Sequence, residues 1–319
     1  GIIISILTGL SFARLNFEYP ENEAEYSWIL NILGDKDSPT SSLKNRIVKI
    51  IANIVIGAVM ILSVFAGATV TAGIKDIIST YKFGINNYVL CIIILLIPAI
   101  TNIIGTESTT MLNKIIMIVI TLCFLLIVGI AIFYNKYIGE NKLIPNKISD
   151  LSGIVRSAFL SIFAFNGFQS VVQMSEEAKN RSDIPKGIIT SLSISGVLYI
   201  IVTISVISII GIKKASKSIY PISEAFSVLP WKNEQDIINF LSILCMFGTL
   251  LMMIFSSSRL LQKLSKLDLA PAYLKKLSGD KKMPINSIIT YCILSFLLII
   301  IGKGILEKLA IGSNLMVFF

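Results

Sequence analysis

The sequence predicts an all-α protein that crosses a membrane several times. Hydrophobic residues make up 54% of its 319 residues and charged residues only 15%. Soluble domains usually carry about 25% charged residues, and a globule of this size could not bury so much apolar surface, so a bilayer is its natural solvent. Apolar runs near the roughly 20 residues that a spanning helix needs recur between short polar breaks. The alternating polarity of barrel strands is not seen.

Eight apolar runs are predicted as membrane helices, and a ninth is cut off by the end of the chain. The breaks between them are rich in turn-forming residues. Pro98 lies inside the third run and should kink it, which membrane helices tolerate. Asp183 and Pro185 suit the first turn of the sixth run. In chain order the runs cover 1–33, 47–78, 87–104, 111–134, 154–174, 188–212, 237–261 and 285–301, and the ninth begins near 305.

The two ends of the chain lie in apolar sequence. The first residues, from Gly1, lack the basic start and cleavage site of a signal peptide, and the last residues, up to Phe319, are apolar as well. We therefore expect one transmembrane domain, residues 1–319, that is a fragment truncated at both ends.

Charge and composition exclude several functions. The net charge is +9 without a nucleic-acid motif, so basic residues beside the spans should contact lipid headgroups, and no nucleic-acid partner is expected. The chain has no His, and its four cysteines are isolated, so we expect no metal, no cofactor and no enzyme activity. An excess of basic residues after the seventh run predicts that this loop is cytoplasmic. These residues are Arg259, Lys263, Lys266, Lys275, Lys276, Lys281 and Lys282.

The fifth run is interrupted by polar residues near its centre. Asn166 and Gly167 weaken helical propensity there, and Gln169 and Ser170 add polar groups. Helices broken at the membrane midplane bind solutes through free backbone amides and carbonyls. Hydrogen bonds from Asn and Gln to neighbouring helices, with Gly allowing close packing, explain the same residues without a ligand. Both interpretations stay open on this window alone.

Three other polar features have simpler explanations. Arg14 lies in an apolar run, where it would pair with Glu18 four residues later or extend to the membrane surface near a helix end. The serines at 256–258 could ligate a cation, but serines in helices more often bond to carbonyls of the preceding turn. The mixed charges of 176–187 are most simply those of a solvated loop.

Several windows, in this order, resemble the amino acid–polyamine–organocation superfamily, and most closely its cationic amino acid transporter-like members. The window that joins 163–169 to 176–180 and 183–185 is the most specific, and it resembles the family's sixth helix and the loop after it. The resemblance covers nearly the whole chain. The other windows are 11–15 with Pro20 and Tyr26, 102–108 with Asn113, 258–260, 269–271, 284–286 and 311–313.

The resemblance implies a leucine-transporter-type bundle of two inverted five-helix repeats, in which solute binds where the first and sixth helices unwind. It implies that the family's first helix and last two helices are absent from this chain. Carried over, Phe163 would cover the substrate and the following backbone would bind it, while Gln169 stands where the family often has an acid. The implied substrate-binding residues are Phe163, Ala164, Phe165, Asn166, Gly167 and Gln169.

The implied function is secondary active transport of amino acids, cationic ones included, or of related small organic solutes, by alternating access. Expected partners are an amino acid or polyamine substrate, the lipid bilayer, and a proton, a sodium ion or a counter-substrate that drives transport. The alternative is a non-transporting sensor or inactive paralogue on the same fold. It is motivated by Arg14 and Ile118, which replace a family Glu and a family Lys or Asn, and by Gln169.

Overall fold

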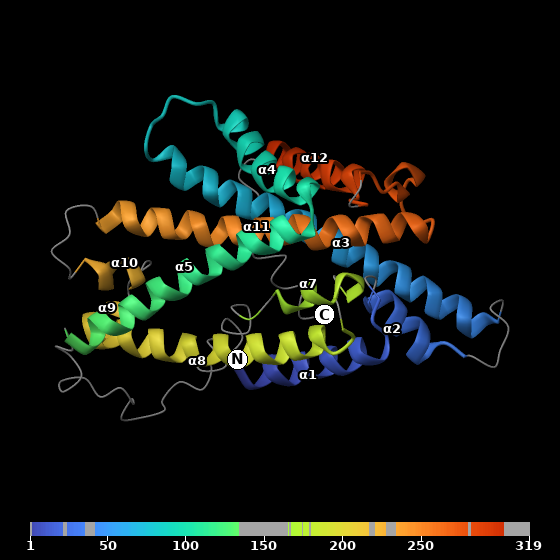
Figure 1. The fold of residues 1–319 in the computed structure, drawn as a ribbon, viewed down its shortest axis with the longest axis horizontal. Helices are drawn as coiled ribbons and strands as arrows, with labels where there is room; N and C mark the ends of the chain where they lie inside the picture. Colours follow the sequence, from blue (N-terminus) through green and yellow to red (C-terminus); the bar gives the residue numbers. More distant parts are fainter. Residues whose placement is uncertain are drawn as a thin grey trace. The chain divides into compact units, whose positions relative to one another are not determined.

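The computed structural model shows a helical protein (Figure 1). It describes residues 2–21, 24–35, 42–133, 165, 167–173, 175–178, 180–216, 221–227, 234–279 and 282–302. Within these ranges the only β-structure is an isolated bridge between Ser278 and Met283. The helices are α1 (Ile2–Glu18), α2 (Ala24–Leu33), α3 (Leu43–Ser79), α4 (Asn87–Ile104), α5 (Thr106–Phe133), α7 (Phe168–Val172), α8 (Asp183–Ile210), α9 (Ile212–Ala215), α10 (Pro221–Phe226), α11 (Glu234–Lys266) and α12 (Ile285–Ile301), with short 3-10 turns η1 (Ser175–Glu177) and η2 (Ala272–Lys275).

Five of these helices, α3, α4, α5, α8 and α11, are long and apolar enough to cross a membrane, and α12 is a shorter apolar helix. Many of their large apolar side chains face outward, among them Ile54 and Ile194. A bilayer would cover such side chains, so the protein is a multi-pass integral membrane protein, as the composition predicts.

Several helix boundaries differ from the sequence prediction, and three of them bear on the site. The first run is two helices, because the chain leaves α1 at Tyr19-Pro20 and α2 begins four residues later. Helix α5 begins at Thr106, five residues before the expected start, directly after Gly105, whose φ of +141° ends α4. Helix α11 continues to Lys266, five residues beyond the expected end at Leu261, so Lys263 is helical rather than a loop residue. The predicted ninth run and 154–164 lie outside the described residues.

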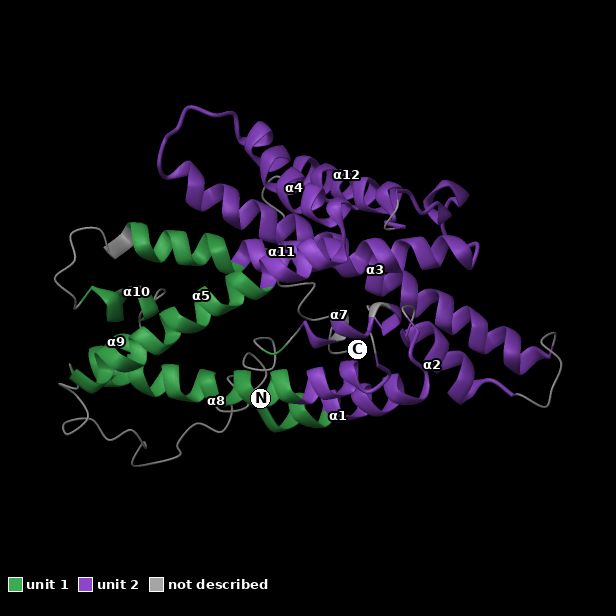
Figure 2. Ribbon diagram, in the orientation of Figure 1, with its two compact units in different colours: residues 1–7, 114–166, 190–245 green, residues 8–113, 167–189, 246–319 purple. Residues whose placement is uncertain are grey.

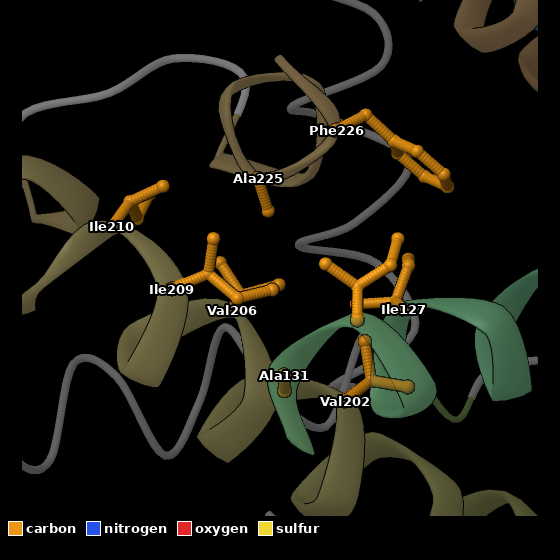
Figure 3. Packing of buried hydrophobic residues seen from close by; sticks show 9 residues of the cluster. Ile127, Ala131, Val202, Val206, Ile209, Ile210, Ala225 and Phe226 are labelled. Atoms are coloured by element: carbon orange, nitrogen blue, oxygen red, sulfur yellow. The ribbon is translucent and has the colours of Figure 1, made fainter. Parts of the chain in front are cut away.

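The chain divides into two compact units (Figure 2). One contains residues 1–7, 114–166 and 190–245, and the other contains 8–113, 167–189 and 246–319. In the first unit, α5, α8 and α10 share an apolar core, in which Ala225 lies close to the side chains of Ile127 and Val206 (Figure 3). Ile118, on α5 in this unit, is half exposed.

The second unit has its core among α3, α4, α11 and α12. Helices α3, α4 and α12 pack against one another, and α2 packs on α3. Buried polar groups join the helices: Tyr291 Oη donates a hydrogen bond of 2.8 Å to the Ser63 carbonyl, and the hydroxyls of Ser63 and Ser257 are hydrogen-bonded. Asn102 Nδ2 donates to the Leu251 carbonyl at 3.2 Å. Such bonds fix the relative positions of helices that are otherwise apolar.

Candidate functional site

The predicted helix break lies at Gly167. Its φ of +122° and ψ of −23° are not helical, and α7 begins only at Phe168. Such a φ strains any residue with a Cβ, which explains a glycine at this position. Helix α7 ends after five residues, at Val172. In the described part of the fifth apolar run, therefore, the backbone is not one continuous helix.

The sequence-predicted site residues fall on both sides of this break. Phe165 and Gly167 are described, Gln169 lies in α7 with its side chain outside the described part, and Phe163, Ala164 and Asn166 lie outside it altogether. The boundary between the two units falls between Asn166 and Gly167. The described residues therefore include only part of the predicted six-residue site, and the joint role of the six stays a prediction.

On the first unit's side, Phe165 is anchored on α8. Its ring is buried and lies 5.3 Å from the ring of Tyr199, at an interplanar angle of 64°. A Cβ added at Gly196, also on α8, would lie 3.8 Å from the Phe165 ring, so the helix approaches it closely. The ring is engaged in packing, which agrees with a role of Phe165 through its backbone.

On the second unit's side, α7 is anchored on α1 by aromatic packing. The rings of Phe168 and Phe12 have centroids 5.3 Å apart and lie edge to face, at 86°. Phe12 makes a similar contact of 5.1 Å with Trp28 of α2. Val172, the last residue of α7, is fully buried. These contacts hold a helix that is too short to be stable by itself.

The turn η1, after α7, is held by polar contacts that the sequence did not predict. Asn16 of α1 donates from Nδ2 to Ser175 Oγ at 2.6 Å, and Ser175 Oγ donates to the carbonyl of Val172. Glu176 forms an ion pair with Lys263 of α11. Asn16 and Ser175 are buried, and Asn16 lies 159 residues before its partner, so only the tertiary structure could reveal the pair.

The start of α8 is tied to α1 in the same region. Arg181 donates from Nη2 to the carbonyl of Glu18 at 2.6 Å, and its guanidinium carbon lies 5.8 Å from the centre of the Phe17 ring. A carbonyl at the end of α1 thereby accepts a hydrogen bond from a charged donor. The stretch read as a solvated loop is therefore attached to two helices, α1 and α11.

Over its whole length, residues 1–319, the chain matches the family model described as amino acid permease. The chain belongs to the amino acid permease family. It is 29% identical over 181 residues to the branched-chain amino acid permease BcaP of Bacillus subtilis. The aligned segment covers 56% of this chain and 38% of the relative. It is 23% identical over 317 residues to BcaP of Lactococcus lactis, covering 93% of this chain and 65% of that protein.

A third relative of this permease-family chain is the Arabidopsis thaliana protein named cationic amino acid transporter 3, mitochondrial. The two are 29% identical over 141 residues, which is 44% of this chain and 23% of the relative. The chain thus spans between about a quarter and two thirds of the length of these three relatives. The predicted superfamily is confirmed.

Arg14 of the permease-family chain forms the ion pair that was one of its two expected arrangements. Its Nη2 lies 2.7 Å from Oε1 of Glu18, and both side chains are exposed. The ion pair joins residues one helical turn apart, and neither charge is buried in the unit. Arg14 therefore does not distort α1, although it departs from the family pattern.

Arg259 is a buried cation near the end of the seventh predicted run, and the sequence analysis counted it with the basic residues of the following loop. The central carbon of its guanidinium lies 3.4 Å from the centre of the Phe255 ring. The guanidinium also donates a hydrogen bond of 2.9 Å to the Phe255 carbonyl and one of 3.3 Å to Thr106 Oγ1. Phe255 lies four residues before Arg259, a spacing that places both on one face of a helix. That spacing is a sequence signal for a helical Arg259. The hydrogen bond of Arg259 to Thr106 connects the end of α11 to the start of α5.

The serines at 256–258 form bonds within the protein. Ser256 donates to the Met253 carbonyl at 3.4 Å and Ser258 to the Phe255 carbonyl at 3.0 Å, while Ser257 bonds Ser63. Ser256 and Ser258 thus show the backbone bonding that was the simpler explanation. In the part of the permease that the structure describes, no cluster of three or more metal-ligating side chains occurs, and none of the four cysteines forms a disulfide.

Proposed function

We propose that the full-length protein is a secondary active transporter that moves amino acids, or closely related small organic solutes, across a membrane by alternating access. The observation that carries this proposal is the interruption at Gly167 of an apolar run in a permease-family protein. A non-helical residue inside such a run turns the backbone away from the regular helical hydrogen-bond pattern, and backbone groups at such a break can bind a polar solute without exposing it to lipid.

The proposed substrate site centres on this break. The backbone from Ala164 to Gly167 would bind the ammonium and carboxylate groups, and Phe163 would cover the solute. Packing of the Phe165 ring on α8 and of the Phe168 ring on α1 supports this role, because it leaves the intervening backbone as the polar element of the segment. The mechanism has no covalent step. On binding, the charged groups of the solute lose their hydration water and interact with backbone dipoles instead.

The site sequence supports a preference for zwitterionic amino acids. Residues 163–169 contain no acidic side chain, and Gln169 is neutral where many family members carry an acid. A cationic side chain would then lack a charged partner at this position. The relatives' names cover both classes, branched-chain and cationic, so the substrate class is to be decided by direct competition. A proton gradient, a sodium gradient or a counter-substrate would drive transport.

The test is uptake by the full-length protein in proteoliposomes. Labelled leucine and labelled arginine would be offered in turn, under a proton gradient, under a sodium gradient, and with amino acid preloaded inside. We expect leucine uptake above empty liposomes in at least one condition, and weaker arginine uptake. Absence of uptake of either amino acid by folded protein would overturn the transport proposal. Binding without uptake would instead identify the sensor.

A further inference from the structure

The segment between α11 and α12 is folded against the ends of both helices. Side chains of α11 and α12 donate hydrogen bonds to its backbone carbonyls. These bonds run from Gln262 Nε2 to Lys275 at 3.2 Å, from Ser265 Oγ to Pro271 at 2.6 Å, from Asn286 Nδ2 to Tyr273 at 2.7 Å and from Ser287 Oγ to Leu274 at 3.3 Å. Leu274 and Met283 are buried. The segment is therefore an ordered surface, and we call residues 266–279 with 282 and 283 the η2 platform.

The η2 platform is basic, and apolar side chains are exposed beside its charges. It holds four lysines and one aspartate, which gives a net charge of +3. The aspartate, Asp268, is already paired: Lys275 Nζ lies 2.7 Å from its Oδ1, and the hydrogen bond and charge of Lys275 lower the pKa of Asp268. The other three lysines, Lys266, Lys276 and Lys282, are exposed. Leu269, Tyr273 and Leu277 are exposed as well, at 39%, 55% and 41%.

Tyr273 indicates the depth of the η2 platform relative to the bilayer. Its hydroxyl is hydrogen-bonded to Thr290 Oγ1 at 3.2 Å, in the second turn of α12. On α12, Ile289 and Ile293 are 47% and 52% exposed, and a bilayer would cover such side chains. A tyrosine, with an apolar ring and a polar hydroxyl, is typical of the boundary between membrane and water. The η2 platform therefore lies at the level of the lipid headgroups.

The combination of charge, exposed apolar side chains and depth fits one class of ligand. A soluble polyanion would neutralise the lysines but would leave Leu269 and Leu277 in water. An anionic phospholipid offers both a phosphate for the lysines and hydrocarbon for the leucines. A lysine acts as a point charge rather than as a shaped fork of donors, so the charge of the headgroup matters more than its shape.

We propose that the η2 platform is a binding site for anionic phospholipids, in which Lys266, Lys276 and Lys282 contact the headgroup phosphates. The site is local, unlike the general attraction of basic residues to headgroups that the composition predicts. Because the platform is hydrogen-bonded to both α11 and α12, a bound lipid also stabilises the ends of these two helices. The proposal concerns lipid recognition and does not depend on the proposed transport function.

The test measures lipid binding to the purified full-length protein. Phosphatidylglycerol is titrated into the detergent-solubilised protein, and native mass spectrometry gives the fraction that carries lipid. The test variant combines Lys266→Gln, Lys276→Gln and Lys282→Gln. We expect its affinity to fall on the order of 100-fold, because each lysine near an anionic lipid contributes about fivefold, or about 1 kcal/mol. Phosphatidylserine should behave in the same way, and zwitterionic phosphatidylcholine should bind weakly to both proteins.

Two further variants separate a local site from the total charge. The matched control combines Lys44→Gln, Arg46→Gln and Lys49→Gln, three exposed residues in the first turns of α3. It loses the same charge, on the side of the membrane where the predicted orientation places the η2 platform, and should keep its affinity for phosphatidylglycerol. Lysine-to-arginine changes at 266, 276 and 282 keep the charge and should keep binding.

Unchanged affinity in the test variant, or an equal loss in the control, would overturn the site. So would displacement of the lipid by inorganic phosphate, added as its ammonium salt at the lipid concentration, since it would show that the acyl chains contribute nothing. Thermal unfolding supplies an independent measurement. Without lipid the test variant should unfold at the original temperature, because the three side chains are exposed. Phosphatidylglycerol should stabilise the unmodified protein alone, and equal stabilisation of both proteins would contradict the proposal.

Discussion

At the scale of single residues, Gly167 has the clearest consequence. Its positive φ was foreseeable in part, because Asn-Gly inside an apolar run disfavours a helix. The surroundings of Gly167, in contrast, could not be foreseen from the sequence. Among the residues that the structure describes, none beyond its chain neighbours has an atom within 4 Å of where the Gly167 Cβ would stand, so the positive φ accounts for the glycine.

We predict that Gly167→Leu abolishes substrate binding. A side chain at this φ costs about 1–3 kcal/mol of strain, and relieving the strain would move the backbone that the proposed site uses. Affinity should fall more than about tenfold, which corresponds to about 1.4 kcal/mol. Scintillation proximity binding of labelled amino acid to the purified full-length protein measures this.

The matched control for this variant is Gly57→Leu. Gly57 lies in α3, has no atom of another residue near its Cβ position, and is not at positive φ, so leucine should favour the helix there. Binding should be retained. Wild-type affinity in Gly167→Leu would contradict the assignment of the break to the substrate site.

At the scale of helices, α3 and α12 approach closely at Gly67. A Cβ at Gly67 would overlap Tyr291 Oη and lie 3.2 Å from Ser295 Oγ. Tyr291 is fully buried, so its hydroxyl cannot turn toward solvent. The sequence shows Gly67 as one small residue in a long apolar run, and nothing in that run indicates that a tyrosine 224 residues later needs the space.

We predict that Gly67→Ala lowers the stability of the full-length protein by about 1–3 kcal/mol, the usual cost of overpacking a core. Tyr291→Phe alone should cost about 1 kcal/mol through the lost hydrogen bond to Ser63. Thermal unfolding in detergent, followed by intrinsic fluorescence, reports both.

The double variant tests the contact directly. With phenylalanine at 291 the alanine at 67 no longer meets a hydroxyl, so the two losses should sum to less than their separate values. Strict additivity would mean that Gly67 and Tyr291 do not compete for the same space.

Helix boundaries show how far pattern analysis reaches. The apolar runs located α3, α4, α8 and α12 to within a few residues, because length and hydropathy decide whether a segment spans a bilayer. The analysis ended α11 too early, at Leu261, because it treated cationic residues as loop residues. Phe255 and Thr106 accommodate Arg259 inside the helical unit, and such partners are known only once the helices are packed.

At the scale of the whole molecule, the charge distribution predicts orientation. The segment between α11 and α12 carries Lys275, Lys276 and Lys282, and basic loops remain on the cytoplasmic side. The loop between α3 and α4 should then lie on the other side, since an odd number of the predicted spans separates the two loops.

We predict opposite labelling of two cysteines in intact cells that express the full-length protein. Phe83→Cys, at an exposed position before α4, should react with a membrane-impermeant maleimide. Leu277→Cys, exposed between α11 and α12, should react only after permeabilisation. The reverse pattern would show that the orientation is inverted.

The sequence by itself determined that the protein lies in a membrane, its fold class, its family and the place of the helix break. Each of these depends on local composition or on short motifs, which the chain carries wherever it folds. Tertiary structure alone decided which polar side chains meet: Asn16 with Ser175, Glu176 with Lys263, and Tyr291 with Ser63. These partners lie from 87 to 228 residues apart, and helical periodicity specifies a face but not the neighbour against which that face packs.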